Sequence, residues 1–310
     1  MNPLGFLLLA SFCLPIVATA AEPPLREQAI AGMNRAAEFY RAKASAHGGY
    51  VYYCSLDFTQ RWGEGKATPD QIFIQPPGTP AVGMAFLKAH AATGDKFYLD
   101  AAQAAAEALV FGQLQSGGWA QVIYFDPRGA KAGQYRNSKS RGRNYSTFDD
   151  GISQSALRFL MHADQALGFK HAAIHEASDF ARKAVFAAQH PNGAFPQVWT
   201  GPAPQYSPVK ASFPDYEWRT ENRLKNYYDM PTLNDDLCTY VAQMLEDGWT
   251  IYKDERCRTA LAKLVQVHRV TGDARYLEPI PARSRGSGAR ACPTVASPAT
   301  MSCARTSRST

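Results

Sequence analysis

Two short acidic segments hold residues whose types and positions suit metal chemistry. Asp149-Asp150 and Asn234-Asp235-Asp236 each come just before a stretch of apolar residues with helical spacing. One residue in each segment could cap the following helix, because Asp and Asn accept backbone N–H bonds there. Capping does not explain two or three acids and amides in a row, since adjacent carboxylates repel unless a cation neutralises them. Oxygen donors without a His or Cys pattern indicate Ca²⁺ or Mg²⁺.

Both acidic segments belong to an internal repeat. Each unit has a Thr-containing loop and two helices, and the first two units close with a glycine turn followed by an aromatic residue, which the third lacks. The loops begin at Gly78, Thr147 and Thr232, and the closing turns contain Trp119 and Phe195. Apolar spacing predicts helix pairs over 81–95 and 97–115, 153–168 and 172–189, and 237–252 and 257–270, and one more helix over about 24–46 that ends before Gly48-Gly49-Tyr50.

Repeated helix hairpins predict an all-α fold, an α/α barrel or toroid, with small β elements in the loops at 50–54 and 121–125. The loops would then gather at one end, where functional residues usually lie. Three long loops interrupt the repeat, at 55–78, 126–146 and 200–230. The second and third carry Arg and Lys, and the third also aromatics, a combination that suits a carboxylated sugar. The alternative is that the loops only seal the helix ends.

The N-terminal residues predict export. Residues 1–21 contain an apolar run from Leu4 to Val17 followed by Ala18-Thr19-Ala20, the pattern of a secretory signal peptide with its cleavage site. The alternative is a short membrane anchor, although the run is short for one. We therefore expect a secreted or periplasmic protein without stable membrane insertion, acting as a monomer.

The C-terminal residues differ in composition from the rest. Residues 281–310 hold five arginines, no acid and no aromatic, so most of the net charge of +6 lies there. Such a stretch cannot bury a core, and we expect a disordered basic tail after a domain over 22–280. We interpret the tail as a frame shift or truncation, with a natural extension as the alternative. No nucleic-acid motif accompanies the charge, so nucleic acid is not an expected partner.

Four motifs together resemble a known family. GGW-x-Q at 117–121, T-F-D-D-G…ALRFL at 147–160, AQHPNGAFPQ at 188–197 and T-L-N-D-D at 232–236 are similar, in order and spacing, to the pectate lyases of polysaccharide lyase family ten, the pectic acid lyases. The resemblance covers roughly residues 80–276. It implies an α/α barrel-like fold, Ca²⁺ as cofactor, polygalacturonate as partner, and calcium-assisted β-elimination as the reaction.

The resemblance also implies roles for individual residues. Asp149 matches the family's calcium-binding aspartate, Asp150 stands where the family has Asn, and Asn234, Asp235 and Asp236 match its second acidic motif. Arg158 matches a helix arginine that would meet a substrate carboxylate, with a structural ion pair as the alternative. Phe195 replaces a Trp of the family. The full set of expected substrate-binding residues is Arg158, Trp119, Gln121, Phe195, Gln197, Lys225 and Tyr227.

The catalytic base is not assigned. The family implies an arginine in a late Ala-Arg segment, but Ala282-Arg283 and Ala289-Arg290 lack the family's context, so the role is transferred to neither. Two other functions stay open. One is a toroidal glycoside hydrolase with Asp149 and Asp235 as acid and base, and the other is a carbohydrate-binding protein without catalysis. A lyase makes an ultraviolet-absorbing double bond and stops on chelation, which separates it from both.

Overall fold

The computed structural model describes residues 24–138, 142–204, 230–232 and 236–271, in two compact units divided after Ser45. The first unit contains α1 (Leu25–Ala44), which confirms the predicted N-terminal helix. The predicted signal peptide at 1–21 and basic tail at 281–310 lie outside the described residues. Within the described part, every helix is too short or too polar to cross a lipid bilayer.

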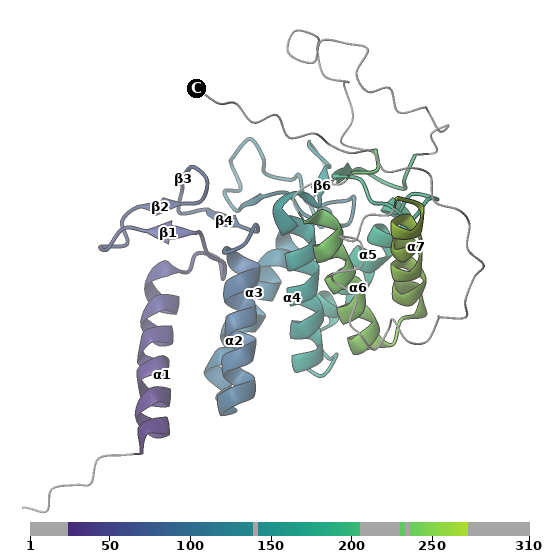
Figure 1. Cartoon of the computed structure of the whole chain (residues 1–310). Coiled ribbons are helices and arrows are strands. Elements are labelled where there is room, and N and C mark those ends of the chain that lie inside the picture. The colour runs from purple at the N-terminus through teal and green to yellow at the C-terminus, as the bar shows by residue number, and fades with distance from the viewer. Residues whose placement is uncertain (1–23, 139–141, 205–229, 233–235, 272–310) are drawn as a thin grey trace, which may run out of the picture. The chain divides into compact units, whose positions relative to one another are not determined.

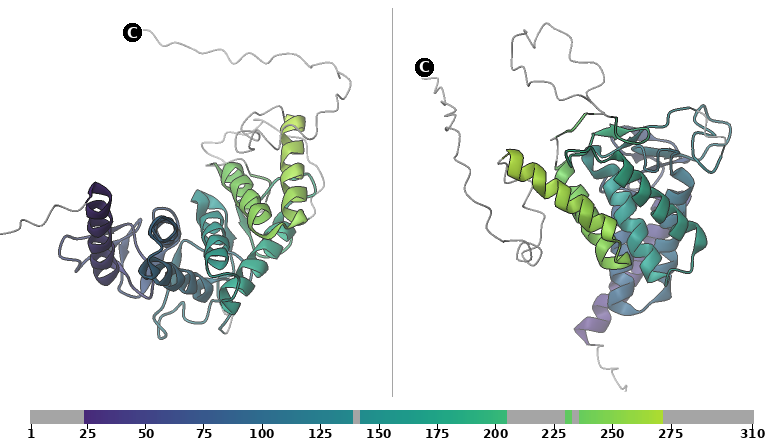
Figure 2. Two further views of the ribbon diagram at one scale, coloured as in Figure 1. Left: turned by 90° about the horizontal axis from the view of Figure 1, so that it is seen from below. Right: turned by 90° about the vertical axis from the view of Figure 1, so that its right-hand side faces the viewer.

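The second unit is built from helix hairpins, as the repeat predicts. In each hairpin the two helices pack against one another, and α2, α4 and α6 also pack side by side, as do α3, α5 and α7 (Figures 1 and 2). The result is a double layer of helices. Contacts among the described helices do not themselves close this double layer into a ring. The helices are α2 (Thr79–Thr93), α3 (Lys96–Gly112), α4 (Ile152–Ala166), α5 (Ala172–Ala188), α6 (Leu237–Tyr252) and α7 (Glu255–Thr271).

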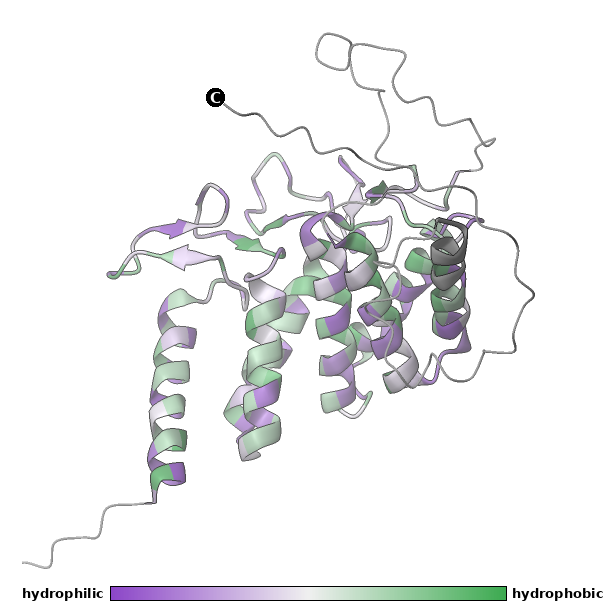
Figure 3. Ribbon diagram, viewed as in Figure 1, coloured by the Kyte–Doolittle hydropathy of each residue, from purple (hydrophilic) through white to green (hydrophobic). Residues whose placement is uncertain are grey.

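Local signals explain where these helices begin and end. Pro80 lies in the first turn of α2, and Gly94 ends the helix in the left-handed conformation. The Asp95 side chain caps α3 by accepting from the Phe97 N–H at 2.8 Å. Apolar residues recur between polar ones along each helix (Figure 3). In α3 the buried residues are mostly alanines, whose small side chains let neighbouring helices approach closely.

The glycine turns that close the hairpins are copies of one structure. In the first copy, buried Gln113 donates from Nε2 to the carbonyls of Gly117 and Ala177, both at 3.0 Å. In the second, Gln189 donates in the same way to Gly193 and Ala260, both at 2.9 Å. Each turn is thereby tied to the outer helix of the next hairpin.

Glycine is required in these turns for two reasons. Gly117 and Gly193 have φ of 95° and 93°, a region that favours glycine. A Cβ would also lie 2.2 Å from the Ala184 Cβ at Gly117, and 2.3 Å from the Lys263 carbonyl oxygen at Gly193. The turns therefore allow the next outer helix to pack directly on the backbone.

Short strands lie at one end of the helices of the second unit (Figure 1). The predicted β elements near 50–54 and 121–125 are confirmed. They pair antiparallel with strands from the inserted loops, and a further pair joins the loop before α4 to the loop after α5. The strands are β1 (Tyr53–Cys54), β2 (Arg61–Trp62) and β3 (Lys66–Ala67) in one sheet, β4 (Gln71–Phe73) with β5 (Val122–Tyr124), and β6 (Ser146–Thr147) with β7 (Val198–Trp199).

Candidate active site

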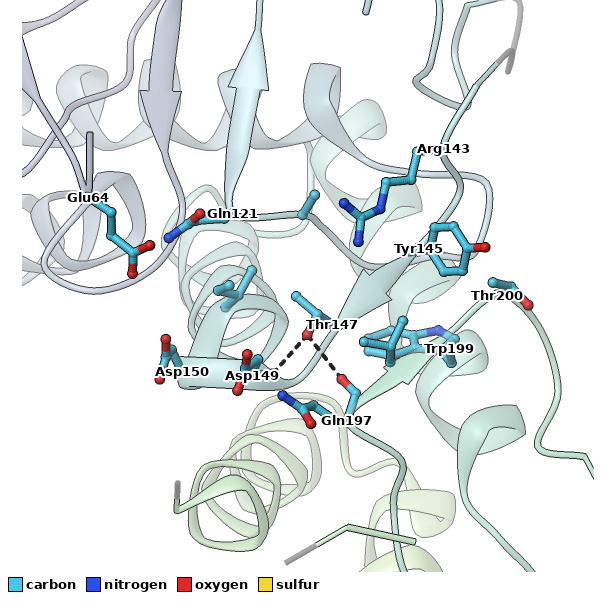
Figure 4. Close-up of a pocket in the computed structure, with 13 residues that line it drawn as sticks. Glu64, Gln121, Arg143, Tyr145, Thr147, Asp149, Asp150, Gln197, Trp199 and Thr200 are labelled. Carbon is cyan, nitrogen blue, oxygen red and sulfur yellow. Dashed lines mark hydrogen bonds between the residues drawn. The ribbon is translucent and has the colours of Figure 1, made fainter. Parts of the chain in front are cut away.

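A cleft of about 860 Å³ lies at the strand-bearing end of the second unit (Figure 4). Its size falls in the range of small-molecule and substrate pockets. It is formed where the β6–β7 pair meets the start of α4 and the β2–β3 turn. The lining residues are Glu64, Ala120, Gln121, Arg143, Tyr145, Thr147, Asp149, Asp150, Ile152, Gln197, Val198, Trp199 and Thr200.

One chain segment, residues 143–149, supplies much of the lining. Its odd-numbered residues line the cleft, whereas Asn144, Ser146 and Phe148 do not. This is the alternation of an extended chain, in which successive side chains point to opposite sides. Asn144 accepts the Ser116 N–H at 2.7 Å, and Ser146 Oγ lies 2.7 Å from Ser116 Oγ. These inward contacts fix the segment, so its outward side chains are held at the cleft.

Thr147 connects this segment to the acidic turn that follows. Its Oγ1 donates to the Gln197 carbonyl at 3.0 Å and accepts from the Asp149 N–H at 3.0 Å. The chain then turns through the short 3₁₀ helix η1 (Asp149–Gly151), in which Asp150 has φ 47°. Gly151 is the cap residue of α4, and no side chain caps this helix. Neither aspartate side chain caps α4, and both residues line the cleft.

The second acidic segment has the same backbone form where it is described. Asp236 is the cap residue of α6, has φ 55° and ψ 17°, and makes no capping bond with its side chain. Gly151 has the matching values of 70° and 18°. Thr147 and Thr232 also donate their N–H groups to the equivalent carbonyls of Trp119 and Phe195, at 3.1 and 2.9 Å. Asn234 and Asp235 lie outside the described residues.

The two acidic segments lie at the same end of neighbouring helices. η1 packs against both α4 and α6, which carry these segments at their first residues. The ring of Tyr240, in the first turn of α6, is within 3.5 Å of the position that a Cβ on Gly151 would take. The convergence of the two segments, expected from the repeat, is thus consistent with the packing of the helices that carry them.

The acidic end of the cleft is ordered by amides. Gln121 donates from Nε2 to Gln75 Oε1 at 2.7 Å, and Gln75 donates from Nε2 to Asp150 Oδ2 at 3.1 Å. Burial raises the pKa of Tyr52 beside this end, and the negative charge of Glu64 raises it further. The carboxylate of Asp149 forms no hydrogen bond or ion pair among the described residues.

The donors at this end suit a hard divalent cation in kind, because they are carboxylate, amide and hydroxyl oxygens. Asp149 and Asp150 are adjacent carboxylates on one wall of the cleft, and the Asp149 carboxylate is not neutralised by a described cation. Among the residues that the structure describes, no three His, Cys, Asp or Glu side chains gather closely enough to hold a metal ion. The two aspartates fit as part of a cation site.

Two of the expected substrate-binding residues are corrected by the structure. Trp119 and Phe195 are both 0% exposed, so neither ring can meet a substrate. Trp119 donates its Nε1–H to the Leu109 carbonyl at 2.8 Å, and Phe195 packs edge-on against Phe148 at 5.6 Å between ring centroids. Both are core residues of the glycine turns, like the buried Tyr50 that follows Gly48-Gly49.

The structure gives Arg158 the ion pair that was the alternative to a substrate role. Its Nε donates to Asp247 Oδ2 at 2.6 Å, and its Nη1 donates to Gln243 Oε1 at 2.8 Å. Asp247 also contacts His162 at 3.3 Å. Arg158 does not line the cleft, and it links α4 to α6, which is the ion-pair alternative.

The structure places Gln121 and Gln197 in the cleft and adds residues that the sequence did not single out. Lys225 and Tyr227 lie outside the described residues. Glu64, Arg143 and Tyr145 come from the inserted loops. The sequence predicts a binding role for those loops as a whole and singles out none of these three residues. The alternation Arg143, Tyr145, Thr147, Asp149 was the available signal, because it puts these four residues on one side of an extended chain.

Comparison with known proteins identifies the region that carries this cleft. The family model of pectic acid lyase matches residues 113–261. This part of the chain is therefore similar to the pectic acid lyase family. The match includes both acidic segments and the cleft segment 143–149. A comparison with curated proteins finds no match.

Solved structures with similarity to the chain include two family 10 polysaccharide lyases from Cellvibrio cellulosa. One is a mutant in complex with trigalacturonic acid, at 19% identity and TM-score 0.36, covering 52% of this chain and 50% of that one. The other has 19% identity and TM-score 0.35, covering 59% and 48%. A family 76 α-mannanase from Bacteroides thetaiotaomicron has 10% identity and TM-score 0.43, covering 81% and 66%. The chain spans about half the length of the two lyases.

Proposed function

We propose that the chain is a secreted polysaccharide lyase that cleaves polygalacturonate by calcium-assisted β-elimination. The observation that carries the proposal is that Asp149 and Asp150 line the cleft and do not cap α4. The similarity of residues 113–261 to the pectic acid lyase family supports a lyase. The apolar run at 4–17 supports export. We further propose that the double layer of helices belongs to a toroid.

In this proposal Asp149 and Asp150 hold the calcium ion, with Asn234, Asp235 and Asp236 as the further ligands expected from the second acidic segment. Bound calcium would withdraw charge from the C6 carboxylate of a uronate and so acidify its C5 proton. Thr147 fixes the backbone of Asp149, and Gln75 holds the Asp150 carboxylate through a chain of amides. The elimination removes the C5 proton and breaks the C4–O bond, and we assign the base to none of the described residues.

The decisive test is the product formed from polygalacturonate, followed by the ultraviolet absorbance of the new double bond. We expect absorbance with calcium and none after chelation. Asp149→Asn should lower the rate by at least about 10–100-fold, because losing a proposed ligand should weaken metal binding no less than losing an outer-shell partner. Asp100→Asn is the control, because Asp100 pairs with Lys96 on the surface of α3, outside the cleft. New reducing ends without absorbance would indicate a hydrolase, and retention on the polymer without product would indicate a binding protein. Either result would overturn the proposal.

A further inference from the structure

The cleft has two chemically different ends. Glu64, Asp149 and Asp150 lie on one side, and Arg143 lies on the other, beside Tyr145 (Figure 4). Arg143 and Asp149 are six positions apart on a largely extended segment, so up to roughly 20 Å of chain separates them. Because side chains stand apart along an extended chain, Arg143 and the acidic end face different parts of a ligand that lies along the segment. A ligand that uses both must carry more than one polar group along its length.

Arg143 is held at the cleft by its neighbours in the chain. Asn144 is bound to the Ser116 backbone, and Ser146 is fully buried and accepts the Gly118 N–H at 2.8 Å. The guanidinium lies 5.1 Å from the centroid of the Tyr145 ring. This cation–π contact orients the side chain without neutralising it.

The charge of Arg143 is available to a ligand. Other arginines of the second unit have acidic partners: Arg136 pairs with Glu176, and Arg182 with Asp254. Arg143 forms no ion pair with any residue that the structure describes. A guanidinium binds carboxylates through two parallel N–H bonds, and the half-exposed ring of Tyr145 offers a flat apolar surface beside it.

We propose that Arg143 determines specificity by binding the carboxylate of a second uronate, one that lies along the sugar chain from the uronate at Asp149 and Asp150. This inference rests on the proposed function and adds a recognition residue to the same cleft. With this contact the protein would prefer sugar chains in which neighbouring uronates both carry free carboxylates, because esterification of the second carboxylate would remove the group that Arg143 binds.

The test compares the KM of variants on polygalacturonate of graded methyl esterification. For Arg143→Gln we expect KM on the unesterified polymer to rise about tenfold, the equivalent of roughly one lost charge-assisted hydrogen bond, with kcat within about twofold. Arg143→Lys should recover part of the loss, because it keeps the charge but not the paired donors. Arg128→Gln is the matched control, an exposed arginine of the same loop that does not line the cleft.

The dependence on esterification is the readout that a merely structural role would not change. The KM of the parent protein should rise steeply with esterification, and that of Arg143→Gln should stay nearly flat. Equal slopes, or an unchanged KM, would overturn the inference while leaving the lyase function intact. If the parent protein yields no unsaturated product, the proposed function fails. Retardation of the same variants in gels containing polygalacturonate then decides the role of Arg143 by binding alone.

Discussion

The glycine turns and the cleft segment use similar residue types for opposite purposes. Tyr50, Trp119 and Phe195 occupy the same position in three turns and are 1%, 0% and 0% exposed. Tyr145 of the cleft segment has no counterpart in the other repeats and is 47% exposed. An aromatic residue that recurs in several repeats serves the packing that those repeats share. One that occurs in a single repeat is free to serve binding.

The acidic segments occur in two of the repeats, which is fewer than the turn aromatics and more than Tyr145. Asp149-Asp150 and Asn234-Asp235-Asp236 occur before α4 and α6, but the equivalent loop before α2, Gln75-Pro76-Pro77-Gly78, has no acid. Packing common to all hairpins therefore does not require acids at this position. Their restriction to two neighbouring repeats is what a shared site between those repeats needs.

The largest expected effect is the loss of a turn aromatic. Trp119→Ala should lower the free energy of unfolding by about 3–5 kcal/mol, because it leaves a cavity and removes the bond to the Leu109 carbonyl. Tyr145→Ala, the control from the cleft, should change it by less than about 0.5 kcal/mol. Urea unfolding measures both. Similar losses in the two variants would contradict the comparison.

Much of the fold could be predicted from the sequence because helix signals are local. α4 is expected over 153–168 and runs from Ile152 to Ala166, since apolar spacing and a glycine turn fix it from nearby residues. The pairing of Ser146 with Trp199 could not be predicted in the same way. It joins strands of two residues each across more than fifty positions, and such strands carry no periodicity.

The site was predictable only in part, and for similar reasons. The acids before α4 and α6 were visible because they repeat at a helix start. Trp119 was misinterpreted because a large flat ring suits a core and a sugar surface equally well. The third aromatic, Tyr50, in an equivalent turn was the signal for the core. Arg158 could not be assigned because its partner, Asp247, lies 89 positions away in the chain.

A smaller effect is expected for the glutamines that tie the turns to the next hairpin. Gln113 is fully buried, and besides its two donated bonds its Oε1 accepts from Arg136 Nε at 2.6 Å. Gln113→Ala should cost about 2–4 kcal/mol of unfolding free energy by leaving buried polar groups unpaired. Gln189→Ala should cost about 1–2 kcal/mol, because Gln189 is partly exposed and water can replace it. The reverse order would contradict the larger cost assigned to the fully buried glutamine.

The last comparison tests whether Arg158 stabilises the packing of α4 on α6 or binds substrate in the cleft. Burial alone would raise the pKa of Asp247, but His162 and Arg158 outweigh it, and the pKa is lowered. The pKa of an aspartate in an unfolded chain is about 3.9. The stabilisation by Asp247 is therefore complete above about pH 3.9, and it is lost as the pH falls through the lower pKa of the folded protein. Asp247→Asn should therefore cost about 1–2 kcal/mol at pH 7, with a difference that shrinks below about pH 4.

Removing the ion pair between Arg158 and Asp247 should leave substrate binding unchanged. Arg158→Gln is expected to lower the unfolding free energy by about as much as Asp247→Asn, roughly 1–2 kcal/mol, because each removes one partner of the pair. Its KM for polygalacturonate should stay within about twofold of the parent value, unlike that of Arg143→Gln. Urea unfolding and initial rates on one preparation give both numbers. A tenfold rise in KM without loss of stability would return Arg158 to the substrate site and remove it from the α4–α6 contact.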